Sequence, residues 1–159
     1  MQKRFNLQPG AIADLPRMQQ TFEASVRQMC NRDYTEAQLD AWIGRATPSR
    51  WEELLTGDLQ FLLAEEEVTK ALAGFTSINT QGYLHSMFVH PDYQRQGVAT
   101  LLLNAAEAFA RKHDAPSVHS EVSLTAQPFF TAKGYHIIKE QTVNIHPESL
   151  QNAVMEKQL

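Results

Sequence analysis

The sequence predicts one domain of mixed α/β class over residues 1–159, in which helices flank a mostly antiparallel sheet. The chain has 159 residues, 43% of them hydrophobic and 20% charged, which is enough for one core without a disulfide or structural metal. Between residues 12 and 55 apolar side chains recur every three or four positions, as they do in helices. From Leu59 onward the period shortens to two, as it does in strands, and two further helical segments interrupt the strands.

A short strand and three helices are expected before residue 58. Apolar and polar residues alternate over residues 5–7, and Pro9-Gly10 follows this segment as a turn follows a strand. Asp14 caps a helix that runs to about Cys30, and its apolar stripe consists of Ile12, Leu15, Met18, Phe22, Val26 and Met29. Two shorter helices follow. The first begins after residues 35–38, which resemble a capping box one residue short, and ends at Gly44. The second covers residues 50–55 and ends before Gly57.

Five strands and two helices are expected after residue 58. Residues 61–64 and 72–78 flank an acidic turn and are typical of an antiparallel pair, and a strand over 83–90 ends at Pro91. The remaining segments are a helix over about 97–113, a strand over 117–123, a short helix over 126–133 and a last strand over 135–145. The tail around Val154-Met155 is a candidate to pair with that last strand.

The balance of charge limits the classes of partner. Fourteen Lys and Arg residues against eighteen Asp and Glu residues give a formal net charge of −4, and no basic run exceeds two residues. A nucleic-acid binder would present a basic face, so no nucleic-acid partner is expected. None of the six histidines has a paired metal-ligand spacing, so no metal is expected either.

The chain is expected to be cytoplasmic. Its single cysteine, Cys30, cannot form an internal disulfide, which fits a reducing compartment. The N-terminal residues lack the apolar core of a signal peptide, and no apolar run approaches the ~18 residues of a membrane span, so no membrane partner is expected. The sequence leaves the oligomeric state open between monomer and homodimer.

A strand that ends at Pro91 leads through a glycine-containing turn into a long helix near Gly97. The first turn of a helix has N–H groups without internal partners and a partial positive charge, so it suits a phosphate. Gly97 lets the backbone approach a bulky anion, Ala99 keeps the next turn small, and Arg95 can add a charge-assisted hydrogen bond. The pattern alone fits nucleotides as well as other pyrophosphates.

Two motifs in the second half of the chain resemble those of the GNAT superfamily of N-acetyltransferases. Gln94-x-x-Gly97-x-Ala99, preceded by residues 88–91, is similar to the motif with which that family binds the pyrophosphate of acetyl-coenzyme A (acetyl-CoA). Residues 123–135 are similar to the family's later motif, Asn/Ser-x-x-Ala-x-x-Phe-Tyr-x-x-x-Gly-Phe/Tyr. In the first half, Tyr34-Thr35, Asp40-Ala41-Trp42 and Arg50-Trp51 resemble a small bacterial subgroup of the family, the YafP-like proteins.

The resemblance implies an acyl-CoA N-acyltransferase fold in which strands 4 and 5 splay apart, with the pantetheine arm of acetyl-CoA inserted as a pseudo-strand. Main-chain groups of Met87, Phe88 and Val89 would bind the arm. The pyrophosphate would be wrapped by Gln94, Arg95, Gln96, Gly97, Val98, Ala99 and Thr100. The other implied contacts are Ser123 on the arm, Phe129 and Phe130 on the thioester, and Lys133 on the adenosine phosphates.

Acetyl transfer to an amine needs a base, because removing a proton of pKa about 10.4 at pH 7 costs about 4–5 kcal/mol. The resemblance implies an acidic residue on the fourth or fifth strand. Glu121 is the leading candidate, since its spacing from Ser123 puts both side chains on one face of the strand. His85 and then His119 follow as neutral proton acceptors. A solvated carboxylate and half-buried histidines are the structural alternatives.

Phe130 departs from the family pattern, because the matching position usually holds a tyrosine that acts as the catalytic acid. A phenyl ring has no proton to donate. Water or another group such as Tyr135 would then assist the leaving thiolate, or the protein is a poor enzyme. Tyr135 is otherwise an aromatic packing residue after Gly134.

Residues 27–57 are expected to recognise the acceptor. Arg27, Tyr34, Trp42 and Trp51 are candidates to border its pocket, as aromatic walls around a cation or an apolar amine, and each fits a core position equally well.

The predicted function is acetyl-CoA-dependent N-acetyl transfer by direct attack of a primary amine of a small molecule or peptide. The alternative is a catalytically impaired acyl-CoA-binding or sensor protein of the same fold. A nucleotide-binding domain is less well supported, since neither Gly-x4-Gly-Lys-Ser/Thr nor Gly-x-Gly-x-x-Gly occurs.

Overall fold

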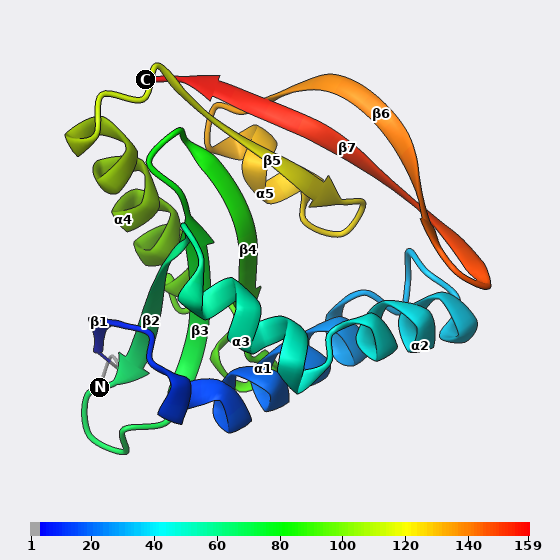
Figure 1. Ribbon diagram of the computed structural model, residues 1–159, viewed down its shortest axis with the longest axis horizontal. Coiled ribbons are helices and arrows are strands. Elements are labelled where there is room, and N and C mark those ends of the chain that lie inside the picture. Colours follow the sequence, from blue (N-terminus) through cyan, green and yellow to red (C-terminus); the bar gives the residue numbers. More distant parts are fainter. Residues whose placement is uncertain (1–3) are drawn as a thin grey trace.

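The computed structural model describes residues 4–159, whose strands form one seven-stranded sheet (Figure 1). The strands lie in the order β1-β2-β3-β4-β5-β7-β6, and neighbours are antiparallel except β4 and β5, which are parallel. Their bounds are β1 (Phe5–Pro9), β2 (Gln60–Glu66), β3 (Leu72–Ile78), β4 (Tyr83–Val89), β5 (Ser117–Ser123), β6 (His136–Ile145) and β7 (Glu148–Gln158). The mixed α/β class and the mostly antiparallel sheet predicted from the sequence are confirmed.

Helices cover both faces of this sheet (Figure 1). One face carries α1 (Leu15–Met29), α2 (Glu36–Arg45) and α3 (Pro48–Thr56), and the other carries α4 (Val98–Lys112) and α5 (Gln127–Ala132). The capping box before α2 is complete, because Thr35 Oγ1 accepts the Gln38 N–H at 3.2 Å and the Gln38 side chain accepts the Thr35 N–H at 2.9 Å. Within residues 4–159 no helix combines the length and the apolar character that crossing a bilayer requires.

The two faces of the sheet have separate cores. Successive residues of a strand point to opposite faces, so Leu63 packs beneath α1 whereas Ala64 packs beneath α4. Phe75 and Phe22 belong to the first of these cores. Burying each large side chain contributes about 1.5–3 kcal/mol, so α1 and α4 together fix the β2–β3–β4 half of the sheet.

β7 is longer than the sequence predicts. The tail around Val154-Met155 pairs with the last strand, β6, as expected, but β7 has 11 residues and its other edge pairs with β5. Its buried apolar residues, Leu150, Ala153 and Met155, are sparse among polar neighbours. Main-chain pairing on both edges stabilises this strand, and that contribution leaves no mark on the residue pattern.

β4 and β5 pair over two positions and then separate. The paired positions are Tyr83 with His119 and Leu84 with Ser120, and the Ser120 hydroxyl donates to the Leu84 carbonyl at 2.7 Å. Beyond Leu84 no strand within the described part of the chain, residues 4–159, pairs with β4 on the β5 side, and Figure 1 shows β5, β7 and β6 diverging from it. The splay expected between strands 4 and 5 is confirmed.

Tyr34 connects the helical layer to the far side of this opening. Its hydroxyl donates to the Gln151 carbonyl of β7 at 2.6 Å and accepts the Leu124 N–H, just after β5, at 2.9 Å. The side chain is 6% exposed. Tyr34 therefore helps to set the distance between α1–α2 and the β5–β7 half of the sheet.

Replacing Tyr34 with Phe is expected to lower the free energy of unfolding by about 1–2 kcal/mol, because two main-chain groups lose a shielded partner. Urea denaturation followed by circular dichroism measures the change. Thr125→Val is the matched control, since it removes an exposed hydrogen bond to Asp33 between the same two regions and should cost less than about 0.5 kcal/mol. Equal losses in the two variants would contradict the role given to the buried hydroxyl.

Candidate active site

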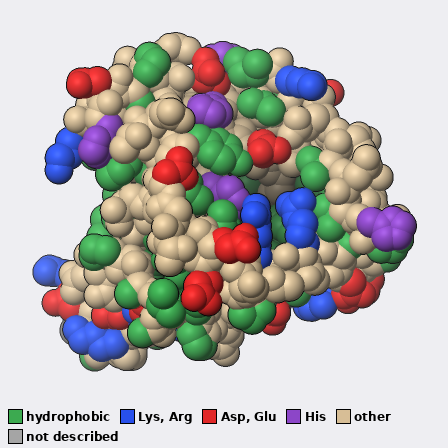
Figure 2. All heavy atoms as spheres, in the orientation of Figure 1, with side chains coloured by type: hydrophobic (Ala, Val, Ile, Leu, Met, Phe, Trp, Pro, Cys, Tyr) green, Lys and Arg blue, Asp and Glu red, His purple; other side chains and the backbone are tan. Residues whose placement is uncertain are grey.

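A cavity of about 760 Å³ opens where β4 and β5 part. Its lining comes from β4, β5, β6, β7 and α5 on one side and from α1, α2 and α3 on the other. Figure 2 shows the hollow near the middle of this face, with Lys or Arg side chains and a histidine gathered beside it. Small-molecule sites occupy about 300–1,000 Å³, so the cavity has the size of a ligand site.

Aromatic rings from the helical layer and from β4 line one part of the cavity. Phe22 lies edge-on to Phe88 with 4.8 Å between ring centroids, and to Trp51 with 5.5 Å. Trp42 lies 5.8 Å from Tyr34 and 6.2 Å from Phe88. This network buries a continuous apolar surface at the inner end of the site.

Three of the four acceptor-site candidates predicted from the sequence line the cavity, and one does not. Tyr34, Trp42 and Trp51 line the cavity, although Trp51 is only 3% exposed and also belongs to the core. Arg27 does not line it. The Arg27 guanidinium instead pairs with Glu36 at 3.1 Å and Asp40 at 2.8 Å.

Glu121 and Ser123 both line the cavity from β5, as their spacing predicts. The Glu121 carboxylate is held on both oxygens: Tyr83 donates its hydroxyl at 3.0 Å and Gln141 its side-chain amide at 2.9 Å. Burial, and next the adjacent Glu121 charge, raise the pKa of Tyr83 to about 12, so the phenol stays protonated. His119 stacks on the Tyr83 ring at 5.3 Å and is not among the lining residues.

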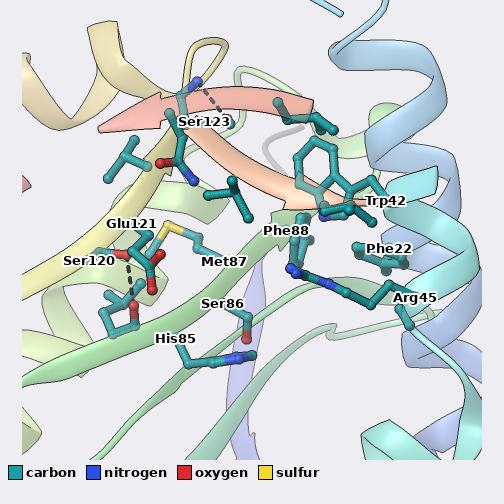
Figure 3. A pocket seen from close by; sticks show the side chains of 18 of the residues that line it. Phe22, Trp42, Arg45, His85, Ser86, Met87, Phe88, Ser120, Glu121 and Ser123 are labelled. Carbon is teal, nitrogen blue, oxygen red and sulfur yellow. Dashed lines mark hydrogen bonds between the residues drawn. The ribbon is translucent and has the colours of Figure 1, made fainter. Parts of the chain in front are cut away.

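His85 enters the cavity from β4, next to the point where the strands part (Figure 3). Its Nδ1 atom is buried and has no hydrogen-bond partner within residues 4–159. Burial is the main cause that lowers the pKa of His85; Arg50 and Arg45 lower it further, and Glu121 opposes them. The imidazole is therefore neutral at pH 7, and its Nδ1 has a lone pair or N–H that makes no hydrogen bond within residues 4–159.

Arg45 and Arg50 line the cavity and were not predicted as site residues. Figure 3 shows the Arg45 guanidinium extending into the cavity from α2, across from Glu121. No specific signal marks Arg45 in the sequence, since a basic residue at a helix C-terminus is common. Tyr83 was missed as well, because only its contact with Glu121 distinguishes it from other strand tyrosines.

The predicted phosphate turn has the backbone conformation that its glycine allows. Gly97 has φ = +81° directly before α4, and Arg95 has φ = +61°. Gln94 donates its side-chain amide to the Val89 carbonyl at 3.0 Å, and Gln96 donates to the Asp92 carbonyl at 3.2 Å. The loop is thus fixed to the end of β4, while the first N–H groups of α4 have no partner inside the helix.

These features suit the parts of acetyl-CoA. The unpaired edge of β4 beyond Leu84 offers main-chain groups to an extended arm, and the turn before α4 suits a pyrophosphate. Asn152 Oδ1, which lies on the cavity lining, is buried without a partner within residues 4–159. Over the same residues, no group of three or more His, Cys, Asp or Glu side chains is arranged to hold a metal ion.

Some residues of the later motif, residues 123–135, line the cavity and others lie outside it. Phe130 is 3% exposed and lines the cavity, whereas Phe129 lies outside the lining, with Lys133 Nζ 5.7 Å from its ring centroid. Tyr135 donates its hydroxyl to the buried Glu107 at 2.8 Å, away from the cavity. Burial and this carboxylate raise the pKa of Tyr135, so the packing interpretation of this residue is favoured.

A sheet that opens between β4 and β5 beside a phosphate turn defines an acyl-CoA N-acyltransferase fold. Residues 30–151 match the family described as an acetyltransferase (GNAT) domain. The uncharacterized N-acetyltransferase YafP of Escherichia coli (strain K12) is 31% identical over 149 residues, which cover 87% of this chain and 83% of that protein. The chain belongs to the GNAT acetyltransferases, as its motifs predict, and is an acetyl-CoA-dependent acetyltransferase.

Solved structures of other acetyltransferases share this fold. A GCN5-related N-acetyltransferase (aminotransferase, class-II) from Rhodopseudomonas palustris has a TM-score of 0.93 at 30% identity, over 100% of this chain and 98% of that one. PaiA N-acetyltransferase from Thermoplasma acidophilum, solved in complex with coenzyme A, has a TM-score of 0.78 at 18% identity, over 98% and 99% of the two chains. At 18% identity, the similarity to PaiA N-acetyltransferase shows a shared fold and nothing more.

Gly97→Val is expected to weaken coenzyme A binding at least about tenfold, because a β-branched residue at φ = +81° is strained and the turn must shift. Isothermal titration calorimetry with coenzyme A measures the affinity. Gly44→Val is the matched control, since both glycines have open space where a Cβ would be added and only Gly97 has a left-handed backbone. Unchanged affinity in Gly97→Val would remove this turn from the coenzyme site.

Proposed function

We propose that this acetyltransferase acetylates a primary amine of a small molecule or peptide by direct attack of the amine on the acetyl thioester. The observation that carries the proposal is the unpartnered imidazole of His85 in a cavity at the parting of β4 and β5. An ammonium group must lose a proton before its nitrogen can attack, and a neutral imidazole can accept that proton.

Acetyl-CoA supplies the acetyl thioester, and we assign its arm to the unpaired edge of β4 at residues 87–89, with Ser123 facing it. Main-chain N–H groups at this edge would stabilise negative charge on the thioester oxygen, and such a contact contributes about 3–4 kcal/mol in acyl transfer. We assign the pyrophosphate to residues 94–100, whose fixed turn supports the role. For Phe129, Phe130 and Lys133 the contacts with the thioester and the adenosine phosphates remain predictions.

The geometry favours His85 over Glu121 as the base. Both oxygens of Glu121 already accept hydrogen bonds, and its side chain lies at an exposed position. His85 has a free nitrogen, and its lowered pKa keeps it neutral where the amine is still protonated. With Tyr135 bonded to Glu107, water or the protonated His85 is left to donate a proton to the thiolate.

Tyr34, Trp42 and Trp51 are the residues that we assign to the acceptor end of the cavity. Their rings suit an apolar body on the acceptor. The single-domain organisation, the cytoplasmic location and the monomeric or homodimeric state stay predictions from the sequence.

The test compares the pH dependence of kcat/KM in the intact enzyme, His85→Gln and Glu121→Gln, with a primary alkylamine as acceptor. In the intact enzyme kcat/KM is expected to rise with pH with a midpoint below 6.5, the ordinary pKa of histidine, and then to reach a plateau, because burial and the nearby guanidiniums lower the pKa of the base. His85→Gln should be about 10²–10⁴-fold slower at pH 7. Its rate should still rise up to pH 9, since only the amine that is free in solution can then react.

Glu121→Gln is expected to keep the plateau of the intact enzyme. If the two variants exchange these profiles, Glu121 is the base and the assignment of His85 is wrong. Coenzyme A affinity, measured in parallel, should be unchanged in both variants. A protein that binds coenzyme A and acetylates no amine of a broad panel would support the impaired acyl-CoA binder instead.

A further inference from the structure

Two arginines of the cavity lack a counter-ion among the residues that the structure describes. Arg45 is in the last turn of α2 and Arg50 is in α3, and both line the cavity. Over residues 4–159 no carboxylate oxygen lies within 4.0 Å of either guanidinium. By contrast, Arg17 and Arg27 are each paired with two carboxylates. Arg45 and Arg50 therefore make no ion pair that would explain their position.

The charge of the cavity is positive although that of the whole chain is −4. The charged side chains of its lining are Arg45, Arg50 and Glu121, which leave one net positive charge when His85 is neutral. Glu121 is bonded to Tyr83 and Gln141 and does not reach the arginines. Both guanidiniums add to the effect of burial that lowers the pKa of His85 and oppose the rise in the pKa of Tyr83, so their field extends to the groups at the parting of the strands.

The phosphates of the coenzyme do not account for these two charges. α2 and α3 cover the face of the sheet that carries α1, whereas Gly97 opens α4 on the opposite face (Figure 1). The phosphate turn and the two arginines thus lie on different sides of β4. An anion between Arg45 and Arg50 would approach from the acceptor side.

We propose that Arg45 and Arg50 form an anion subsite for the acceptor, which is then a primary amine that also carries a carboxylate. This inference rests on the proposed function, because it assigns the acceptor class of the same cavity. A guanidinium binds a carboxylate through two parallel hydrogen bonds and discriminates strongly against a neutral group. The aromatic wall of Phe22, Trp42 and Phe88 receives the apolar body of the acceptor. An amino acid with an apolar side chain combines these three parts.

The test uses three acceptors that share one body: phenylalanine, phenylalaninamide and 2-phenylethylamine. For the intact enzyme, kcat/KM for phenylalanine is expected to exceed that for each neutral-ended analogue roughly 10- to 100-fold. Arg45→Gln and Arg50→Gln should each reduce this preference about tenfold, and the double variant should abolish it. Comparing ratios between variants cancels the different basicities of the three amines.

Two controls separate a specific subsite from general charge. Arg32→Gln removes an exposed charge outside the cavity lining and should keep the preference of the intact enzyme. Arg50→Lys keeps the positive charge but lacks the planar guanidinium, so it should keep part of the preference for phenylalanine. A preference that is equal in the intact enzyme and the double variant would overturn the inference. A loss of coenzyme A affinity in Arg45→Gln and Arg50→Gln would assign the arginines to the coenzyme and overturn it too.

Binding can be followed without turnover, because the two tryptophans of the chain, Trp42 and Trp51, both line the cavity. Their fluorescence should report tighter binding of N-acetylphenylalanine than of N-acetylphenylalaninamide to the protein loaded with coenzyme A. The double arginine variant should erase that difference. Selective binding without acetyl transfer to any amine would refute the proposed function and support the subsite. Acetyl transfer without selectivity for the anion would refute the subsite alone.

Discussion

The separation of β4 from β5 after two paired positions is the constraint on which the rest of the structure depends. Each half of the sheet is held independently: β4 pairs with β3, and β5 pairs with β7 along seven positions. Tyr34 then connects the helical layer with the ends of β5 and β7. The strand edges left at the opening carry polar main-chain groups, and pairing them with an extended ligand would stabilise the opened sheet.

The opening also separates two charge environments. The phosphate turn at Gly97 belongs to the α4 face, while Arg45 and Arg50 reach the cavity from the α2–α3 face. His85, on β4, lines the same cavity as the two arginines. The guanidiniums lower the pKa of His85, so an anion bound between them would weaken this effect and make the imidazole a stronger base. In this account the acceptor that carries a carboxylate would strengthen the base that activates its own amine.

Local signals were sufficient for most of the fold and for the coenzyme turn. Proline, glycine and capping residues bound the helices, and the conformation at Gly97 is determined by that residue and its neighbours. β7 was mostly missed because pairing on both edges, rather than an apolar pattern, stabilises it. The acceptor side could not be predicted in the same way, since Arg45 and Arg50 resemble ordinary surface charges. Tyr83 could not be predicted either, because the residue that accepts its hydrogen bond, Glu121, is 38 positions away in the sequence.

Amide hydrogen exchange with and without saturating coenzyme A tests most directly whether the opening of the sheet holds the coenzyme. The account predicts that exchange slows over residues 85–89 of β4 and over residues 97–100, because the arm and the pyrophosphate accept or cover these N–H groups. Residues 136–139 of β6 lie at the far edge of the sheet, outside the cavity lining, and their exchange should be unchanged. Binding of coenzyme A with no added protection in residues 85–89 would contradict the account.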